Sequence, residues 1–239
     1  MNKQKIKIFC DFDGTITTKD VTDNLFSELG NAEKAYAIYK RWMDKEISYN
    51  RQWDELFNLI PDLTEEKFYN FVDTIEIEYG FKEFVDFCDK NNLELLILSD
   101  GMDLYIKRIL RNNGLEHLKF YSNKLLFTQN GAKLLFPYTD EECKECGNCK
   151  RNHIINHSSD DDITIYIGDG DSDTCPAQYV DYIFAKKTLL KFLERERISY
   201  YPFKNFKDII ARIKPLLQKK KIKKRHQAEL KRKAVYALG

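Results

Sequence analysis

Acidic side chains follow two apolar segments of this sequence. Asp11 and Asp13 come directly after the apolar part of "IKIFCDFDGT". Asp169 and Asp173 belong to "GDGDSD", which directly follows the apolar segment "ITIYI". Ser99 ends a third apolar segment, "LELLILS". Carboxylates that converge on one place repel one another unless a cation neutralises them, and oxygen-rich acidic sites suit Mg²⁺, for which substrate phosphate is a usual further ligand. The pattern is therefore typical of a magnesium site.

Buried parallel strands would bring these distant side chains together. Strand-like apolar runs alternate with helical patterns, which predicts an α/β fold with a Rossmann-like, doubly wound parallel sheet covered on both faces. Residues 16–80 interrupt the alternation with amphipathic segments, and we expect them to form a helical cap over the carboxyl edge of the sheet. Asn130-Gly131 in "KLLFTQNGAKLLF" predicts the turn of a β-hairpin.

The expected organisation has four parts. Residues 1–15 form the first core strand and the loop that carries Asp11, and residues 16–80 form the cap. The rest of the core spans residues 81–218, including a hairpin and a cysteine-rich loop within 119–149. Residues 219–239 form a basic C-terminal tail.

Composition favours a globular protein of the cytoplasm. The 239 residues are 43% hydrophobic, enough to bury a sizeable core. No apolar run approaches the roughly 18 residues that a membrane helix needs, so we expect no membrane association. The start, "MNKQKIKIF", lacks the features of a signal peptide.

The charge is distributed unevenly along the chain. Residues 219–239 hold nine Lys or Arg and one acid, a net charge of +8, so the remainder carries −7 of the overall +1. A net-acidic body does not suggest an enzyme built around nucleic acid, although the tail could contact phosphate backbones or anionic lipid. A solvated helical extension or frayed end is the preferred interpretation.

Cysteines cluster before a helical pattern. Cys143, Cys146, Cys149 and His153 offer four ligands for a tetrahedral structural Zn²⁺, with tighter spacing than the common paired arrangement. The alternative is a loop of reduced thiols with His153 on the following helix. Both interpretations remain open from the sequence.

Four motifs together resemble those of haloacid dehalogenase-type phosphatases. They are "DFDGT" (11–15), "LSDG" (98–101), Lys150 and "GDGDSD" (168–173), and the resemblance spans roughly residues 6–210. It implies Mg²⁺-dependent hydrolysis of a small phosphorylated metabolite through an aspartyl-phosphate intermediate. A phosphotransferase would use the same chemistry with a different acceptor.

The resemblance implies roles for individual acids. Asp11 would be the nucleophile, and Asp13 would act as general acid and then as general base. Asp11, the Asp13 backbone carbonyl and Asp169 would hold the metal. Asp173 belongs to the same metal set, where it would orient Lys150 or a metal-bound water.

The resemblance also implies a set of phosphate-binding residues: Gly14, Thr15, Ser99, Asp100, Gly101 and Lys150. Lys150 is preferred to the nearby Lys144 because "KRNHII" opens a helical pattern. Asp100 departs from the family pattern, in which glycine follows the motif serine, and it adds a negative charge beside the pocket.

The position of the insertion resembles the helical-cap branch that contains phosphoserine phosphatase. Within it, "DFDGTITTKD" and "CKECGNCK" are most similar to phosphatases of the methionine-salvage compound 2-hydroxy-3-keto-5-methylthiopentenyl-1-phosphate. Phosphoserine and phosphocholine or phosphoethanolamine phosphatases are the alternatives. Asp20 would bind a substrate amine or hydroxyl, or would cap the first cap helix.

A function of another class is also open. The chain could be a zinc-stiffened binding protein that uses its basic tail for nucleic acid or a membrane and keeps a dormant site. Intact catalytic residues argue against this alternative. The sequence predicts no oligomeric state.

Overall fold

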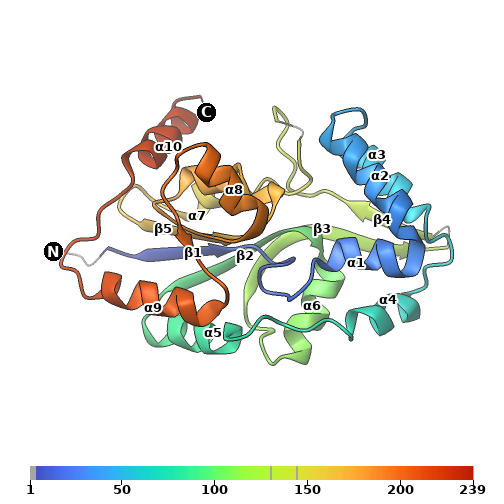
Figure 1. Cartoon of the computed structure of the whole chain (residues 1–239), viewed down its shortest axis with the longest axis horizontal. Coiled ribbons are helices and arrows are strands. Elements are labelled where there is room, and N and C mark those ends of the chain that lie inside the picture. Colours follow the sequence, from blue (N-terminus) through green and yellow to red (C-terminus); the bar gives the residue numbers. More distant parts are fainter. Residues whose placement is uncertain (1–3, 130, 144, 239) are drawn as a thin grey trace.

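A seven-stranded sheet forms the centre of the protein (Figure 1). The computed structural model describes residues 4–129, 131–143 and 145–238. In these residues the strands are ordered β4-β3-β2-β1-β5-β6-β7. Their bounds are β1 Ile6–Cys10, β2 Glu94–Met102, β3 Lys119–Thr128, β4 Gly131–Leu135, β5 Ile163–Gly168, β6 Tyr182–Ala185 and β7 Tyr201–Pro202.

The strand register brings the acidic loops to one edge of the sheet. All neighbouring strands are parallel except the β3–β4 pair. Strand β1 lies between β2 and β5, where Cys10 is level with Ile97 and Ile167. The residues that follow these positions therefore leave the sheet side by side, and the predicted doubly wound α/β fold is confirmed.

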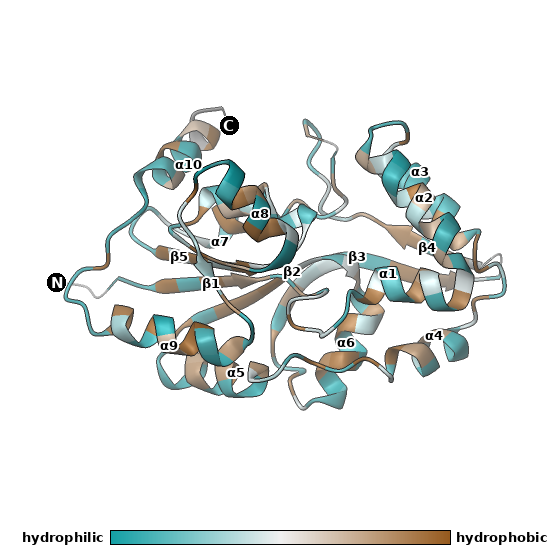
Figure 2. Cartoon of the chain, in the orientation of Figure 1, coloured by the Kyte–Doolittle hydropathy of each residue, from teal (hydrophilic) through white to brown (hydrophobic). Residues whose placement is uncertain are grey.

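Both faces of the sheet are buried, as the near-continuous apolar strands require. Ile165 and its alternate neighbours face one core, and Tyr166 faces the other. Helices α5 (Phe81–Lys90), α6 (Asp103–Asn112) and α9 (Phe206–Leu217) cover the first face, and α7 (Lys150–His157) and α8 (Lys187–Arg195) cover the second. Figure 2 shows apolar residues along the central strands and hydrophilic residues on the outer sides of the helices.

Strand β3 joins two elements that the sequence pattern separates. Its first residues pair with β2 in parallel, and its later residues pair with β4 in an antiparallel hairpin. Gly131 has φ +104°, which suits the predicted turn. Asn130 lies outside the described residues.

The segment predicted as a cap is mostly helical. It contains α1 (Val21–Phe26), the π-helical η1 (Ser27–Asn31), α2 (Ala32–Met43), α3 (Tyr49–Phe57) and α4 (Glu65–Val72). An antiparallel bridge between Thr17 and Ile77 closes its base. Tyr49 of α3 packs against Phe136 after β4, with ring centroids 5.2 Å apart, so aromatic contacts hold the helices against the hairpin.

The C-terminal segment packs against the core through helix α10 (His226–Leu238). The Arg225 guanidinium donates to the carbonyls of Ala177, Gln178 and Val180, and Arg232 is only 2% exposed. Part of the predicted basic tail is thus anchored instead of being fully solvated. Among the described helices, none is long and apolar enough to cross a membrane.

Candidate active site

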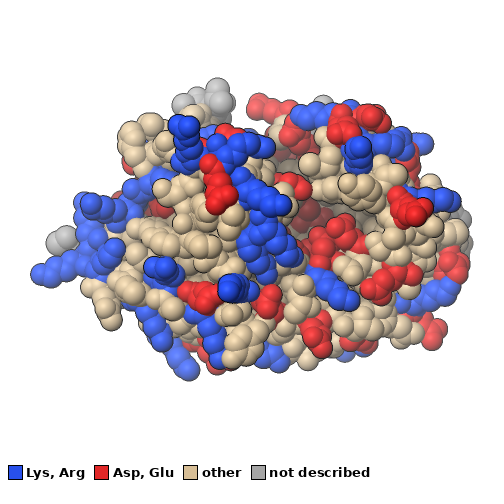
Figure 3. All heavy atoms as spheres, in the orientation of Figure 1, with Lys and Arg blue, Asp and Glu red and all other residues tan. Residues whose placement is uncertain are grey.

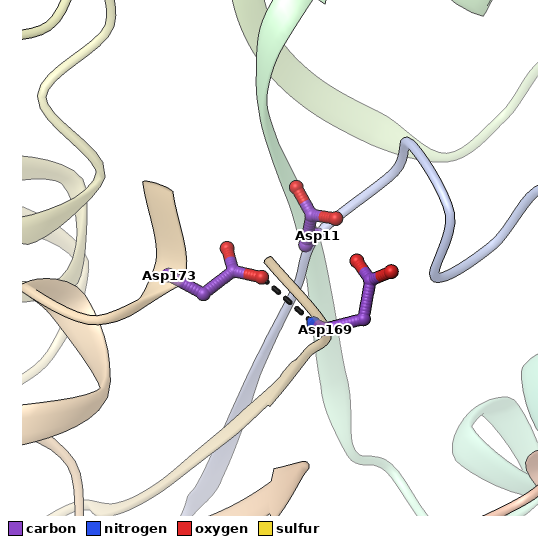
Figure 4. A group of neighbouring side chains, drawn as sticks. All are labelled: Asp11, Asp169 and Asp173. Atoms are coloured by element: carbon purple, nitrogen blue, oxygen red, sulfur yellow. Dashed lines mark hydrogen bonds between the residues drawn. The ribbon is translucent and has the colours of Figure 1, made fainter. Parts of the chain in front are cut away.

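Three buried carboxylates meet at the carboxyl edge of the sheet (Figure 4). Asp11 follows β1, Asp169 follows β5, and Asp173 ends the short 3₁₀ helix η2 (Asp171–Asp173). One oxygen of each lies within 4.8 Å of the others, and in the described part of the chain they form the one such group of three possible metal ligands. Anionic oxygen donors at this spacing fit Mg²⁺. The fold thus brings these three residues together, as the sequence analysis expects.

Lys150 supplies a buried cation that contacts this cluster. Its Nζ donates to Asp11 Oδ1 at 2.6 Å, Asp173 Oδ1 at 2.8 Å and Ser172 Oγ at 3.0 Å, and the residue is 2% exposed. Burial lowers the pKa of Lys150, but the Asp11 and Asp173 carboxylates raise it by more, so it lies well above its usual value. Even with the exposed Lys187 beside Asp169, two ammonium groups do not neutralise three carboxylates, and the remaining negative charge suits a divalent cation. Lys144 lies outside the described residues.

Asp173 is held by four donors. Besides Lys150, the Tyr166 hydroxyl donates at 2.6 Å, and the backbone N–H groups of Asp169 and Gly170 donate at 2.8 and 3.0 Å. The Asp173 carboxylate therefore fixes both Lys150 and the loop that carries Asp169. The sequence analysis did not single out Tyr166, although a tyrosine in a fully buried strand signals a hydroxyl that needs a partner.

Asp13 has a different set of partners. The Tyr105 hydroxyl lies 2.7 and 2.8 Å from its two oxygens, Ser99 Oγ donates at 2.8 Å, and the Val21 N–H donates at 3.3 Å. Burial raises the pKa of Asp13 to about 6, and hydrogen bonds from Tyr105 and Ser99 oppose that rise. A carboxyl group with this pKa can both give and take a proton near neutral pH.

Asp169 contacts two further side chains. Thr15 Oγ1 donates to it at 2.9 Å, and Lys187 Nζ donates at 2.8 Å. The hydroxyls of Thr15 and Ser99, which were predicted to bind phosphate, therefore donate to catalytic-site carboxylates in this structure. The sequence analysis missed Lys187. Its position just after strand β6, at the same edge of the sheet, could have indicated that it lies near the site.

The glycines of the first two motifs have physical reasons to lack a side chain. Gly14 has φ +73°, and a Cβ there would lie 2.6 Å from Asp169 Oδ2. Gly101 donates its N–H to Ser99 Oγ at 2.9 Å. Both residues therefore pack directly against the site.

Two other predicted residues make structural contacts near the site. Asp20 Oδ1 accepts from the Asp23 N–H at 2.8 Å and caps α1, and burial, followed by the charges of Asp13 and Asp23, raises its pKa. Asp100 Oδ1 accepts from the Asn148 N–H at 3.2 Å, so its carboxylate is directed to the segment before Lys150. The helix-cap interpretation of Asp20 thus has a contact that supports it.

The described residues of the cysteine-rich loop form no comparable cluster. Cys143 and Cys146 are half-buried and Cys149 is buried, but in the described residues they belong to no group of three closely spaced metal ligands. His153 Nε2 lies 2.7 Å from Asn148 Oδ1, and its ring stacks on Tyr121 with centroids 4.2 Å apart. These contacts account for the histidine without zinc, and the zinc site stays a prediction.

The acidic side chains of the site lie in a hollow of the surface. Figure 3 shows acidic side chains gathered in a hollow between the α8 side of the core and the cap helices, with basic side chains along its margin. Tyr39 of α2 reaches across and donates its hydroxyl to Asp171 at 2.9 Å. The cap therefore contacts the loop that carries Asp169.

Known proteins are similar to this chain in sequence, and solved structures are similar to it in fold. A 2-hydroxy-3-keto-5-methylthiopentenyl-1-phosphate phosphatase from Bacillus mycoides is 34% identical over 218 residues, which cover 90% of this chain and 99% of that protein. A protein of the same name from Bacillus cereus is 33% identical over the same shares of both chains.

Solved structures agree with the architecture. A phospho-aspartyl intermediate analogue of phosphoserine phosphatase superposes with a TM-score of 0.66 at 20% identity, over 88% of this chain and 99% of that one. A HAD family hydrolase from Salmonella enterica serovar Typhi has a TM-score of 0.68 at 18% identity, over 87% of this chain and 71% of that one. The family described as Putative Phosphatase matches residues 6–199. The chain therefore belongs to the family described as Putative Phosphatase.

Proposed function

We propose that the protein hydrolyses a small phosphomonoester through an aspartyl-phosphate on Asp11. The observation that carries this proposal is the contact between the buried Asp11 carboxylate and the Lys150 ammonium, 2.6 Å apart, inside a cluster of three acids. A carboxylate is a recognised phosphoryl acceptor when the charge repulsion is offset. Lys150 offsets part of it directly beside the attacking group.

The reaction uses two aspartates in sequence. An Asp11 oxygen forms a bond to phosphorus as the bond to the leaving oxygen breaks, and protonated Asp13 gives its proton to that oxygen. Asp13 then takes a proton from water, whose oxygen displaces Asp11 and releases inorganic phosphate. Both groups return to their starting protonation states.

The donor set fits one divalent cation. Asp11, Asp169 and the Asp13 backbone carbonyl would hold Mg²⁺, which supplies further neutralisation of the phosphate charge. We assign Asp173 to orienting Lys150 and the Asp169 loop, because donors already occupy both of its oxygens. Thr15 and Ser99 hydroxyls remain the proposed donors to phosphoryl oxygens once substrate is present.

We propose 2-hydroxy-3-keto-5-methylthiopentenyl-1-phosphate as the substrate. The support is the name carried by the Bacillus relatives together with nearly full-length alignment at 33–34% identity. Phosphoserine, phosphocholine and phosphoethanolamine are the alternatives, for which Asp20 would face the substrate amine. Burial raises the pKa of Asp20, which favours its neutral form and weighs against this role.

Phosphate release from all four compounds tests this assignment. With Mg²⁺, we expect the enol phosphate to give the highest kcat/KM and EDTA to abolish release. Preference for an amine-bearing substrate would reject the substrate but keep the reaction. Absence of turnover from every compound, with Asp11→Asn indistinguishable from the natural chain, would reject the phosphatase. Product analysis with an added alcohol separates hydrolysis from phosphoryl transfer.

A cytoplasmic location is also proposed. All six cysteines are free thiols, as is usual in a reducing compartment. Cell fractionation tests the location.

Zinc at Cys143, Cys146, Cys149 and His153 stays a prediction. Elemental analysis of purified, active protein decides it, because a structural site requires about one zinc per chain. Active and folded protein without zinc would eliminate the site.

The alternative function, a zinc-stiffened binding protein, predicts that the basic tail binds nucleic acid or a membrane. Contacts of Arg225 and Arg232 with the core weigh against it, since these two cations face protein. Salt-sensitive binding to nucleic acid or anionic vesicles that disappears on deleting residues 219–239 would support it.

A further inference from the structure

Tyr105 of α6 contacts Asp13 but has no part in the reaction as described above. Its side chain is 0% exposed, and its hydroxyl lies 2.7 Å from Asp13 Oδ1 and 2.8 Å from Oδ2. In the described part of the chain, the hydroxyl has one further hydrogen-bond partner, Thr22 Oγ1, 3.3 Å away. A buried phenol that has both carboxylate oxygens within reach is placed to control that carboxylate.

The backbone of strand β2 makes room for this contact. A Cβ on Gly101 would lie 1.4 Å from the Tyr105 hydroxyl oxygen, 2.5 Å from its Cζ and 2.8 Å from Asp13 Oδ2. The Tyr105 ring also lies against Phe12, with centroids 6.1 Å apart. Gly101 is therefore needed for the phenol to reach Asp13, whatever it contributes to phosphate binding.

The start of α6 is itself fixed to the sheet. Asp103 Oδ1 accepts the Leu125 N–H at 3.0 Å, which ties the first turn of the helix to β3. Tyr105 follows two residues later on the same short helix. The phenol is thus presented from a rigid element, which is what accurate positioning of a catalytic group requires.

Donors from three elements define the direction of the Asp13 carboxylate. Ser99 approaches Oδ2 from β2, Val21 approaches Oδ1 from α1, and Tyr105 spans both oxygens from α6. A general acid must lie within hydrogen-bond reach of the leaving oxygen, and small misplacements cost rate. Ser99 is also the proposed phosphate donor, so Tyr105 is the side-chain donor that can stay on Asp13 throughout the reaction.

We propose that Tyr105 is a positioning residue whose hydroxyl holds the Asp13 carboxyl group in the direction from which it protonates the leaving oxygen. This inference rests on the proposed role of Asp13 as general acid. It predicts that removing the hydroxyl lowers kcat/KM most for substrates whose leaving oxygen needs a proton.

The test compares leaving groups in Tyr105→Phe, which keeps the buried ring. The quantity is kcat/KM at one pH with saturating Mg²⁺, because it reports the steps up to leaving-group departure and not the later hydrolysis of the aspartyl-phosphate. For alkyl phosphates we expect a loss of about tenfold, part of the 10²–10⁴ that general acid catalysis supplies. For p-nitrophenyl phosphate, whose leaving group departs as a stable anion, we expect a loss of less than about twofold.

Two further variants make the result interpretable. Tyr182→Phe removes a tyrosine hydroxyl that donates to the Lys223 carbonyl away from the site, and it should leave both substrate classes unchanged. Asp13→Asn should show the same selectivity for alkyl phosphates as Tyr105→Phe, with a larger loss. Hydrolysis of p-nitrophenyl phosphate reports that each variant is folded, and Tyr105→Met replaces the Phe variant if that one does not fold.

The outcomes separate this inference from the proposed function. If Asp13→Asn loses activity equally on alkyl and aryl phosphates, Asp13 is not the general acid and the proposed mechanism fails. If Asp13→Asn is selective but Tyr105→Phe is not, the mechanism stands and the positioning role of Tyr105 is wrong. An equal loss on both substrates in Tyr105→Phe would mark the hydroxyl as merely structural.

Discussion

Asp11 and Asp13 lie two residues apart at the end of one strand, yet their surroundings differ in kind. Asp11 contacts the ammonium of Lys150 at 2.6 Å. Asp13 contacts neutral donors, namely the hydroxyls of Tyr105 and Ser99 and the Val21 N–H. Burial and the charge of Asp173 raise the pKa of Asp11, and the Lys150 ammonium opposes that rise, whereas Asp13 has no contacting cation.

The difference matches the proposed division of work. A nucleophile must be ionised when substrate arrives, which a buried ammonium favours. A group that gives and then takes a proton must be able to exist in both states, and neutral donors bind a carboxylate less strongly than a cation does. Adjacent positions on one loop thus acquire separate roles from the elements packed around them.

The largest expected effect breaks the Asp11 side. Asp11→Asn removes the nucleophile while keeping the shape, so turnover should fall by more than about 10⁴-fold, well within the range of enzymatic acceleration. Phosphate release with Mg²⁺ measures this, and circular dichroism confirms that the variant is folded. Retained turnover would contradict the aspartyl-phosphate mechanism.

Removing the cation from the Asp11 side should cost stability. Lys150→Met leaves two buried carboxylates without their partner, and the free energy of unfolding in EDTA should fall by about 3–5 kcal/mol. Urea denaturation measures the change.

The matched control is Lys187→Met, at the pair with Asp169 where the lysine side chain is 53% exposed. Removing this exposed partner should cost less than about 1 kcal/mol. Equal losses in the two variants would mean that burial of the Lys150 cluster has no special electrostatic consequence.

The Asp13 side should show a pH-dependent gain in stability on substitution. Because burial raises the native pKa of Asp13 to about 6, above the roughly 3.9 of an unfolded chain, ionised Asp13 destabilises the fold. Its stability contribution is present below about pH 4 and is lost as pH rises through about 6. In EDTA, Asp13→Asn should therefore be more stable than the natural chain above pH 6, by about 1–2 kcal/mol for a half-buried group, and the gain should vanish near pH 4.

Denaturation curves at several pH values measure this difference. A gain that is constant across pH would show that ionisation of Asp13 carries no cost. The same series with Lys150→Met should show a loss of stability and not a gain, which keeps the two sides of the comparison distinct.

The smallest expected effect concerns a hydroxyl on the Asp11 side. Tyr166→Phe removes one of the donors to Asp173, which retains Lys150 and two backbone donors, so the loss in unfolding free energy should be about 1 kcal/mol. Urea denaturation again provides the measurement. A loss as large as that of Lys150→Met would show that Tyr166, and not the lysine, dominates the network.

Much of the fold follows from local patterns. Apolar runs such as Ile163–Gly168 are buried on both faces, and the alternation of strands and helices leads to a parallel sheet. The sequence predicts the hairpin around Gly131, but not that its first strand, β3, also pairs with β2 in parallel. Pairing partners of this kind depend on distant segments.

The candidate site divides in a similar way. Asp11, Asp169 and Lys150 are recognisable because each belongs to a short motif at a strand or helix end. His153 carries a motif-like spacing to the cysteines, but the fold turns its Nε2 to Asn148. Spacing along the chain could not reveal which of these partners the imidazole would meet.

The sequence by itself determined which groups gather at the candidate site, because carboxylates after buried strands must emerge at one edge of a parallel sheet. The tertiary structure alone decided how the two neighbouring aspartates differ. Their side-chain donors come from α6, α7 and strand β2, at sequence separations of 86 to 139 residues. The environment of a buried carboxylate is set by whichever donors the packed helices and strands bring to it, and no local pattern encodes that arrangement.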